Sequence, residues 1–184
     1  MDNQVLELLK FAKKLIGIKY TWWTDNEKNE DDFFYVNSIP TRKTLEQKGI
    51  NCSSFINVLR QSTGKKIPES NSPYRGGTYF WYRYLKSKNV LEPFDYTKDY
   101  PLGTLFLRKY KNISDQGHVA VYYKKYKKDP TKLLYGEIIH AYADDTHPTG
   151  GQVGTTIFGF SHFYEGGGKE GYYEYAILPK NWLN

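Results

Sequence analysis

The 184-residue sequence predicts an α+β fold in which N-terminal helices pack on a C-terminal antiparallel sheet. Helical periodicity is confined to the first half of the chain, whereas short strand-like runs follow residue 101. Half of the 16 glycines lie after position 149, which is typical of strands joined by turns. Because the chain has no internal repeat and no second composition regime, we expect one domain over residues 1–184.

The helices are predicted from apolar spacing and stop signals. Residues 3–16 carry one apolar stripe at helical spacing, and Gly17 stands where a helix would end. Residues 24–48 are polar and loop-like. A second helix is expected to start near Cys52 and to stop at Gly64.

The strands are predicted from short apolar and aromatic runs. Residues 78–87 remain ambiguous, because their aromatic residues favour a strand whereas Leu85 and Lys86 favour a helix. Five later runs are expected to be strands, at residues 104–108, 119–123, 133–141, 153–160 and 172–178.

The composition favours a folded chain without disulfides. Aromatic residues make up 17% and hydrophobic residues 39% of the sequence, unlike a disordered protein. The one cysteine excludes an intramolecular disulfide and a cysteine-based zinc cluster. The net charge of +6 is compatible with an acidic partner but does not require one. No nucleic-acid-binding motif or phosphate-binding glycine loop is present, so we expect neither a nucleic-acid partner nor a cofactor.

The sequence contains no membrane-spanning or secretion signal of the usual kind. No stretch approaches the ~20 apolar residues of a membrane span. The N-terminus begins acidic and continues amphipathic, unlike a signal peptide. We therefore expect a monomer in the cytoplasm of the producing cell and leave its final compartment open.

Cys52 is the candidate nucleophile. It stands in GINCSSFINVLR at the expected start of a helix. A helix N-terminus stabilises a thiolate through its positive end and free N–H groups, and the same groups can receive an oxyanion. We therefore expect a partly exposed thiol with a lowered pKa. The alternative is a small buried apolar residue, which is the usual role of a lone cysteine.

His118 and His140 are the candidate base and its orienting partner. His118 precedes one expected strand, His140 ends the next, and residues 124–132 between them resemble a hairpin loop. In a symmetric antiparallel hairpin the two residues lie directly opposite each other on one face, ~5 Å apart. One imidazole could then act as base to Cys52 while the other orients it. A register slip of one residue would separate them, and each could instead be a structural histidine.

The remaining histidines and the basic loop favour simpler interpretations. His147 with Asp144 and Asp145 suggests a metal site only weakly, and His162 is similarly polar in its surroundings, so solvated loops are favoured and no metal is expected. Five lysines at the expected hairpin tip form either a solvated turn or a surface for an anionic polymer or lipid: Lys124, Lys125, Lys127, Lys128 and Lys132.

Five segments in the correct order resemble the NlpC/P60 superfamily of papain-like cysteine peptidases and amidases. The segments are LLKFAKKLIGIKYTWW, NCSSFINVL, YPLGTLFL, GHVAVYY and IIHAY. They are similar to the family's opening helix with its G-x-x-Y-x-W segment, its D-C-S-G-F/L-V motif, and its P-G-D-L-V-F, H-V-G-I-Y and M-I-H-A strands. The match spans roughly residues 5–145.

The resemblance implies a papain-like α+β fold and a cysteine hydrolase that cleaves an amide or peptide bond through a thioester. The family's default substrate is a cell-wall peptide, such as a peptidoglycan fragment. The resemblance assigns six residues, with Cys52, His118 and His140 as nucleophile, base and orienter, and Tyr20, Ser53 and Trp22 in oxyanion or substrate binding.

The chain departs from the family pattern at several places. Asn51 replaces the usual Asp, Ser54 the usual Gly, and Thr104 the Asp of P-G-D-L. Insertions near residues 24–48 and 65–100 enlarge the scaffold. Because long connections in compact domains usually form binding loops, we expect the second, aromatic-rich insertion to form one wall of the substrate groove.

Two other functions remain open. NCSSFINVLR also resembles the N-C-E-H-F-V-N segment of LRAT-like lipid acyltransferases, so the substrate could be a lipid acyl ester or amide. Those enzymes place their histidine before the cysteine, whereas all four histidines here follow it. The CHAP amidases share the G-H-V-A-V strand, but their third residue is typically acidic or Asn. The last alternative is a binding module with a dead site.

Overall fold

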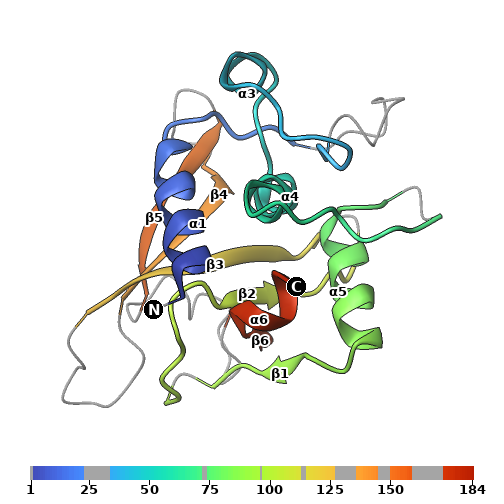
Figure 1. Ribbon diagram of the computed structural model, residues 1–184, viewed down its shortest axis with the longest axis vertical. Coiled ribbons are helices and arrows are strands. Elements are labelled where there is room, and N and C mark those ends of the chain that lie inside the picture. The colour runs from blue at the N-terminus through green and yellow to red at the C-terminus, as the bar shows by residue number, and fades with distance from the viewer. Residues whose placement is uncertain are drawn as a thin grey trace.

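The computed structural model describes residues 2–22, 34–71, 74–95, 97–112, 115–126, 136–144, 150–158 and 172–184. These residues form helices and one antiparallel sheet, which confirms the α+β class (Figure 1). The elements are α1 (Asn3–Lys14), α3 (Arg42–Lys48), α4 (Cys52–Ser62), α5 (Thr78–Ser87), β1 (Glu92–Pro93), β2 (Leu105–Arg108), β3 (His118–Lys125), β4 (Gly136–Ala143), β5 (Gly151–Phe158), β6 (Tyr175–Ile177) and α6 (Pro179–Trp182).

The first helix follows its sequence signals closely. The Asp2 side chain accepts a hydrogen bond from Gln4 N and caps α1. The apolar stripe is buried except for Ile16, which is exposed, and the helix ends two residues before the expected boundary. Gly17 has φ +88°, a conformation that glycine adopts without strain, so the chain turns there.

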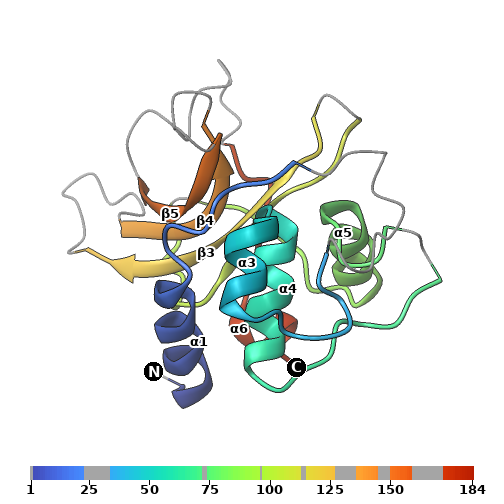
Figure 2. The ribbon, with the colours of Figure 1, turned by 90° about the horizontal axis from the view of Figure 1, so that it is seen from above.

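The sheet has the strand order β1-β6-β2-β3-β4-β5, and each neighbouring pair is antiparallel. Helices α1 and α4 cover one face, which buries the side chains of Val119, Val121 and Ile139 (Figure 2). The opposite face carries a second cluster, in which Phe106 and Tyr122 pack with neighbouring aromatic rings. Alternation along the strands therefore buries both faces.

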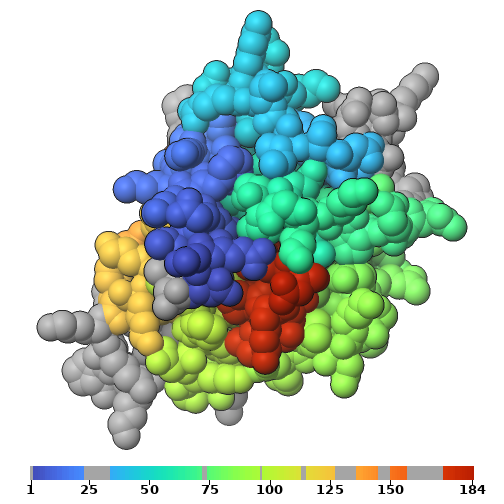
Figure 3. All heavy atoms as spheres, in the orientation of Figure 1, coloured from blue at the N-terminus to red at the C-terminus, as the bar shows by residue number. Residues whose placement is uncertain are grey.

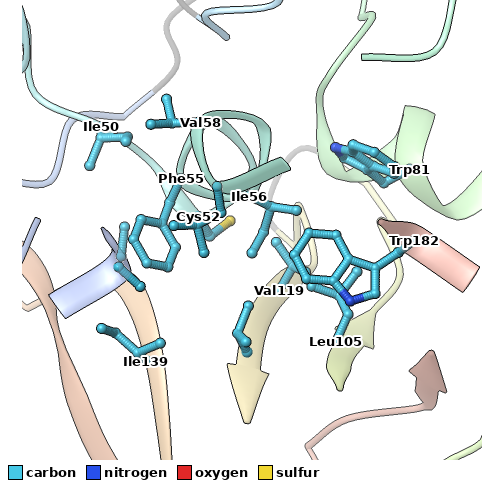
Figure 4. Packing of buried hydrophobic residues seen from close by; sticks show 14 of the residues in the cluster. Ile50, Cys52, Phe55, Ile56, Val58, Trp81, Leu105, Val119, Ile139 and Trp182 are labelled. Carbon is cyan, nitrogen blue, oxygen red and sulfur yellow. The ribbon is translucent and has the colours of Figure 1, made fainter. Parts of the chain in front are cut away.

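Helix α4 lies at the centre of the molecule. Its residues from Cys52 to Arg60 are buried, and Figure 4 shows Phe55 and Ile56 of this helix beside Val119 and Ile139 of the sheet. In the view of Figure 3, the surface of the blue N-terminal segment borders that of the red C-terminal segment. A helix buried along nearly its whole length provides a rigid support for a residue at its start.

The structure also differs from the sequence-based expectations. Helix α3 forms within the segment expected to be a loop, because Thr41 caps it and Leu45 is buried. Residues 78–87 are helical, since Thr78, Trp81 and Leu85 are buried at a spacing of three and four residues. The short elements β1 and α6 were not expected. No described helix is long and apolar enough to cross a membrane.

Candidate active site

Cys52 occupies the first position of α4, where a capping box fixes the helix start. The Asn51 side-chain oxygen accepts hydrogen bonds from Ser54 N at 2.8 Å and Ser54 Oγ at 2.5 Å, and Ser54 Oγ lies 3.4 Å from Asn51 N. Asn51 and Ser54 are two of the three departures from the family pattern, and together they form this cap. The departures therefore preserve a well-defined helix start beneath the thiol.

The segment before Cys52 is held against residues 19–21. Tyr20 forms a bridge with Ile50, and Tyr20 N donates to Gly151 O at 2.8 Å. Gly49 has φ +82°, and a Cβ atom there would meet Thr21 Oγ1 at 1.9 Å. Only glycine permits this approach, which brings Tyr20 beside the start of α4.

The Cys52 sulfur is buried, with 7% of the residue exposed. It lies 3.9 Å from Thr78 Oγ1. Burial raises the pKa of the Cys52 thiol, although hydrogen bonds from Thr78 and from the backbone of Val119 and Ser53 lower it. The expectation of a partly exposed thiol with a lowered pKa is therefore wrong, because the sequence shows the helix start but not the depth at which it is buried.

His118 and His140 share one face of the sheet and touch. His118 Nε2 lies 2.7 Å from His140 Nδ1, and the rings meet edge to face. The symmetric hairpin predicted that the two histidines would lie directly opposite each other, and this prediction is wrong. Val121 pairs with Ile139, so the same register continued places His140 opposite Ala120. The two histidines are thus diagonal neighbours, two residues apart in register, which leaves them on the same face.

Thr156 extends this pair across a third strand. His140 Nε2 lies 2.8 Å from Thr156 Oγ1, and His140 itself pairs with Gly154, so this contact is also diagonal. When Thr156 accepts from His140 Nε2–H, His140 Nδ1 accepts from His118 Nε2–H. In that arrangement His118 Nδ1 keeps its lone pair, as a general base requires.

Burial keeps both imidazoles neutral. It lowers the pKa of His140 to about 3. Burial, with the neighbouring His140 and Arg108, lowers the pKa of His118 well below its ordinary value. With a raised thiol pKa beside them, the resting site holds a neutral thiol and neutral imidazoles rather than a thiolate–imidazolium pair.

One cavity of about 1270 Å³ brings the candidate residues together. Its lining includes all six residues that the resemblance assigned, namely Cys52, His118, His140, Tyr20, Ser53 and Trp22. Burial and then the nearby Cys52 raise the pKa of Tyr20, whose ring meets Trp22 edge to face at 5.2 Å. Ser53 Oγ donates to Asn51 Oδ1 at 3.1 Å, so the backbone N–H of Ser53 is the group that reaches the sulfur.

The cavity contains polar residues that the sequence analysis missed. Arg108 forms an ion pair with Asp115, and its Nη2 donates to Tyr172 Oη at 3.2 Å. Arg108 pairs with His118 across β2 and β3, a position that strand register alone could have indicated. Thr78 and Thr156 were also missed, since their contacts join segments distant in sequence.

The second insertion supplies part of the cavity wall. Tyr74, Thr78 and Tyr79 line the cavity. Phe80 and Trp81, in contrast, pack in the hydrophobic core. The aromatic residues of this insertion are thus divided between the wall and the core.

Several expectations lie partly outside the described residues. His147, His162, Asp145 and residues 127–132 are not described. Of the lysines at the expected hairpin tip, Lys124 and Lys125 form ion pairs with Glu137 and Asp99. Within the described ranges, no group of three or more His, Cys, Asp or Glu side chains is placed to hold a metal ion.

Comparisons with solved structures find a distant structural likeness. No protein-family model matches the sequence, and no curated protein matches it. A crystal structure of a protein from Staphylococcus aureus subsp. aureus Mu50, described as similar to a lipoprotein of the NLP/P60 family, matches with a TM-score of 0.47 and 13% identity. The match covers 97% of this chain and 42% of that one.

Proposed function

We propose that this chain is a cysteine hydrolase of amide or peptide bonds, with Cys52 as nucleophile, His118 as base and His140 as its orienting partner. One observation carries the proposal: a thiol at a capped helix start and a hydrogen-bonded imidazole pair line the same cavity. This is the nucleophile–base–orienter arrangement of covalent catalysis. We take residues 1–184 as one catalytic domain of papain-like NlpC/P60 type.

The neutral resting site sets the order of events. As the sulfur attacks the substrate carbonyl, its proton passes to His118, so the thiolate forms only during attack. The tetrahedral oxyanion receives hydrogen bonds from the N–H groups at the start of α4 and from Tyr20. His118 then protonates the leaving amine, and water hydrolyses the remaining thioester. His140 holds His118 in the tautomer that can accept the proton.

The cell-wall peptide is the first candidate substrate, through the resemblance in sequence. A lipid acyl ester or amide is the second, favoured by exposed rings at the cavity. Trp22, Tyr74 and Tyr79 are 54%, 45% and 38% exposed and all line it. Exposed aromatic patches usually mark surfaces that a ligand covers. The ion pairs of Lys124 and Lys125 weaken the argument for an anionic lipid surface.

A substrate panel tests the proposal. Soluble peptidoglycan fragments and acyl lipids are incubated with the protein, and products are identified by mass spectrometry. Release of a new amine from the fragments supports the peptidase, whereas release of a fatty acid supports the lipid alternative. Cys52→Ala should abolish either activity. If neither class is cleaved and Cys52 resists thiol reagents at every pH, the chain is a binding module.

A further inference from the structure

The second insertion brings a hydroxyl group to the nucleophile. Thr78 Oγ1 lies 3.9 Å from the Cys52 sulfur, within hydrogen-bonding range for sulfur. Thr78 is buried, and within the described part of the chain its hydroxyl makes no other hydrogen bond. The contact joins the first residue of α5 to the first residue of α4. It is therefore directed at the reacting atom rather than at a neighbouring structural group.

Asn57 holds this hydroxyl in place. It lies on α4, five residues after Cys52, and is fully buried. Its Nδ2 donates to Gly76 O at 2.9 Å, and its Oδ1 accepts from Trp81 Nε1 at 2.7 Å. These two bonds fasten the chain on both sides of Thr78 to the helix that carries the nucleophile. The distance between Thr78 and Cys52 is thus set by the nucleophile helix itself.

Thr78 also lies where the start of α5 can stabilise a negative charge on the Cys52 sulfur. It begins a ten-residue helix whose start has no side-chain cap. The positive end of α5 therefore adds to that of α4 near the sulfur. A hydroxyl that donates to sulfur stabilises the thiolate more than the thiol, because hydrogen bonds to a charged acceptor are stronger. The hydrogen bond from Thr78 therefore lowers the pKa of the Cys52 thiol, whereas burial raises it.

We propose that Thr78 is a further catalytic residue, whose hydroxyl donates to the Cys52 sulfur as its proton leaves. The sulfur's proton passes to His118, the Thr78 proton stays on its oxygen, and the sulfur–carbon bond forms as the carbonyl π bond opens to the oxyanion. The inference rests on the proposed function of Cys52 as nucleophile, and it adds to the site a residue from an insertion outside the matched motifs.

The effect of the Thr78 hydroxyl on the Cys52 sulfur can be measured by titration of the thiol, because the groups around the sulfur keep their charge states. Tyr20, Tyr172 and Tyr173 lie near enough to interact electrostatically with Cys52, and each has a raised pKa caused mainly by burial. His118 has a lowered pKa, and the pKa of Arg108, despite partial burial, is raised beside Tyr172 and Asp115, so its guanidinium stays charged. Between pH 6 and pH 9, about the range between ordinary His and Tyr pKa values, these neighbours keep their charge states. A change in thiol reactivity there reports on the sulfur.

The experiment measures the rate of Cys52 alkylation by iodoacetamide against pH in Thr78→Val and Thr78→Ser. Valine keeps the shape of threonine but removes the hydroxyl, and serine keeps the hydroxyl. We expect Thr78→Val to raise the apparent thiol pKa by about one unit, which lowers the alkylation rate below that pKa about tenfold. Thr78→Ser should stay near the wild-type profile. Ser87→Ala removes a hydroxyl at the exposed far end of α5 and serves as the matched control.

Two results would overturn the inference. One is a wild-type pH profile in Thr78→Val, which would mean that Thr78 only lines the cavity. The other is an equal loss in Thr78→Val and Thr78→Ser, which would point to shape rather than to the hydroxyl. Alkylation needs no substrate, so the Thr78 result stands apart from the hydrolase proposal. If neither substrate class is cleaved but Thr78→Val slows alkylation as expected, only the hydrolase proposal is rejected.

Discussion

His118 and His140 are joined at 2.7 Å across two strands in which neither lies directly opposite the other. The diagonal places His140 beside Nε2 of the His118 ring, and in the proposed mechanism His118 then uses Nδ1 to accept the proton of Cys52. His140 is in turn anchored to Thr156 on the next strand. A chain of contacts across three adjacent strands thus ends at the candidate base, and when Thr156 accepts from His140 this chain leaves His118 Nδ1 unprotonated.

The two histidines should differ in their effect on activity. His118→Ala removes the proton acceptor, and we expect a loss of about 10²–10⁴-fold in kcat/KM. His140→Ala leaves the acceptor but frees its orientation and tautomer, so the loss should be smaller. His140→Gln should restore part of it, because the amide can still accept from His118. Steady-state kinetics on the substrate found by the panel provide the measurement, and full activity in His140→Ala would contradict the assigned role.

Wild-type Cys52 should react slowly with iodoacetamide near neutral pH. Its pKa is raised by burial, so little thiolate is present at pH 6 to 7 when compared with a free thiol of pKa about 8.5. The alkylation rate should rise with pH and continue to rise beyond that value. Glutathione measured in parallel is the control. Fast labelling at pH 6 would instead indicate a preformed thiolate–imidazolium pair.

The buried histidines should make the fold sensitive to acid. Their pKa values are lowered in the folded chain, so the unfolded chain binds more protons below about pH 6.5. The contribution of the neutral histidines to the free energy of unfolding is therefore fully present above that pH. It is lost as the pH falls toward about 3, the pKa of folded His140. Each imidazole contributes a slope of about 1.4 kcal/mol per pH unit inside this window.

The measurement is the free energy of unfolding in urea from pH 7 to pH 4, for wild type and His140→Gln. Carboxyl groups titrate in both proteins, so the difference between the two slopes isolates His140. We expect the variant to lose less stability as the pH falls. Equal slopes would mean that His140 is not buried in its neutral form.

Asn57 should be needed to hold both insertions, residues 24–48 and 65–100, against helix α4. Asn57 Nδ2 donates to Phe34 O and Gly76 O, and Oδ1 accepts from Trp81 Nε1. Asn57→Leu keeps the volume but removes these three buried hydrogen bonds, at an expected cost of about 1–3 kcal/mol for each. The urea midpoint should therefore fall strongly. The exposed Asn37→Leu is the control, and similar midpoints for both variants would contradict this role.

Local patterns predicted the parts of the fold that depend on neighbouring residues. The stripe of α1, the start of α4 at Cys52 and the main strands all follow from periodicity and stop signals. The shared face of His118 and His140 was predicted because a register error of two residues preserves the face. The register itself was missed: Lys125 pairs with Gly136 rather than with residue 133, an offset of three residues that the irregularity between Tyr122 and Lys124 reduces to two.

The rest of the candidate site depends on tertiary structure that no local pattern shows. Thr78 reaches Cys52 at the place where Asn57 binds residues on both sides of Thr78 to α4. Thr156 reaches His140 through a diagonal between two strands. The raised pKa of Cys52 has the same origin, because a helix start favours the thiolate but burial by distant segments outweighs it.

The most direct test of the central claim is to trap an acyl group on Cys52. The protein is mixed with a short-chain p-nitrophenyl acyl ester, quenched in acid within milliseconds to seconds, and analysed by intact mass and peptide mapping. We expect one acyl adduct on Cys52, lost on treatment with hydroxylamine, absent in Cys52→Ala and formed far more slowly in His118→Ala. An ester turnover that persists unchanged in Cys52→Ala, or adducts that avoid Cys52, would contradict the account.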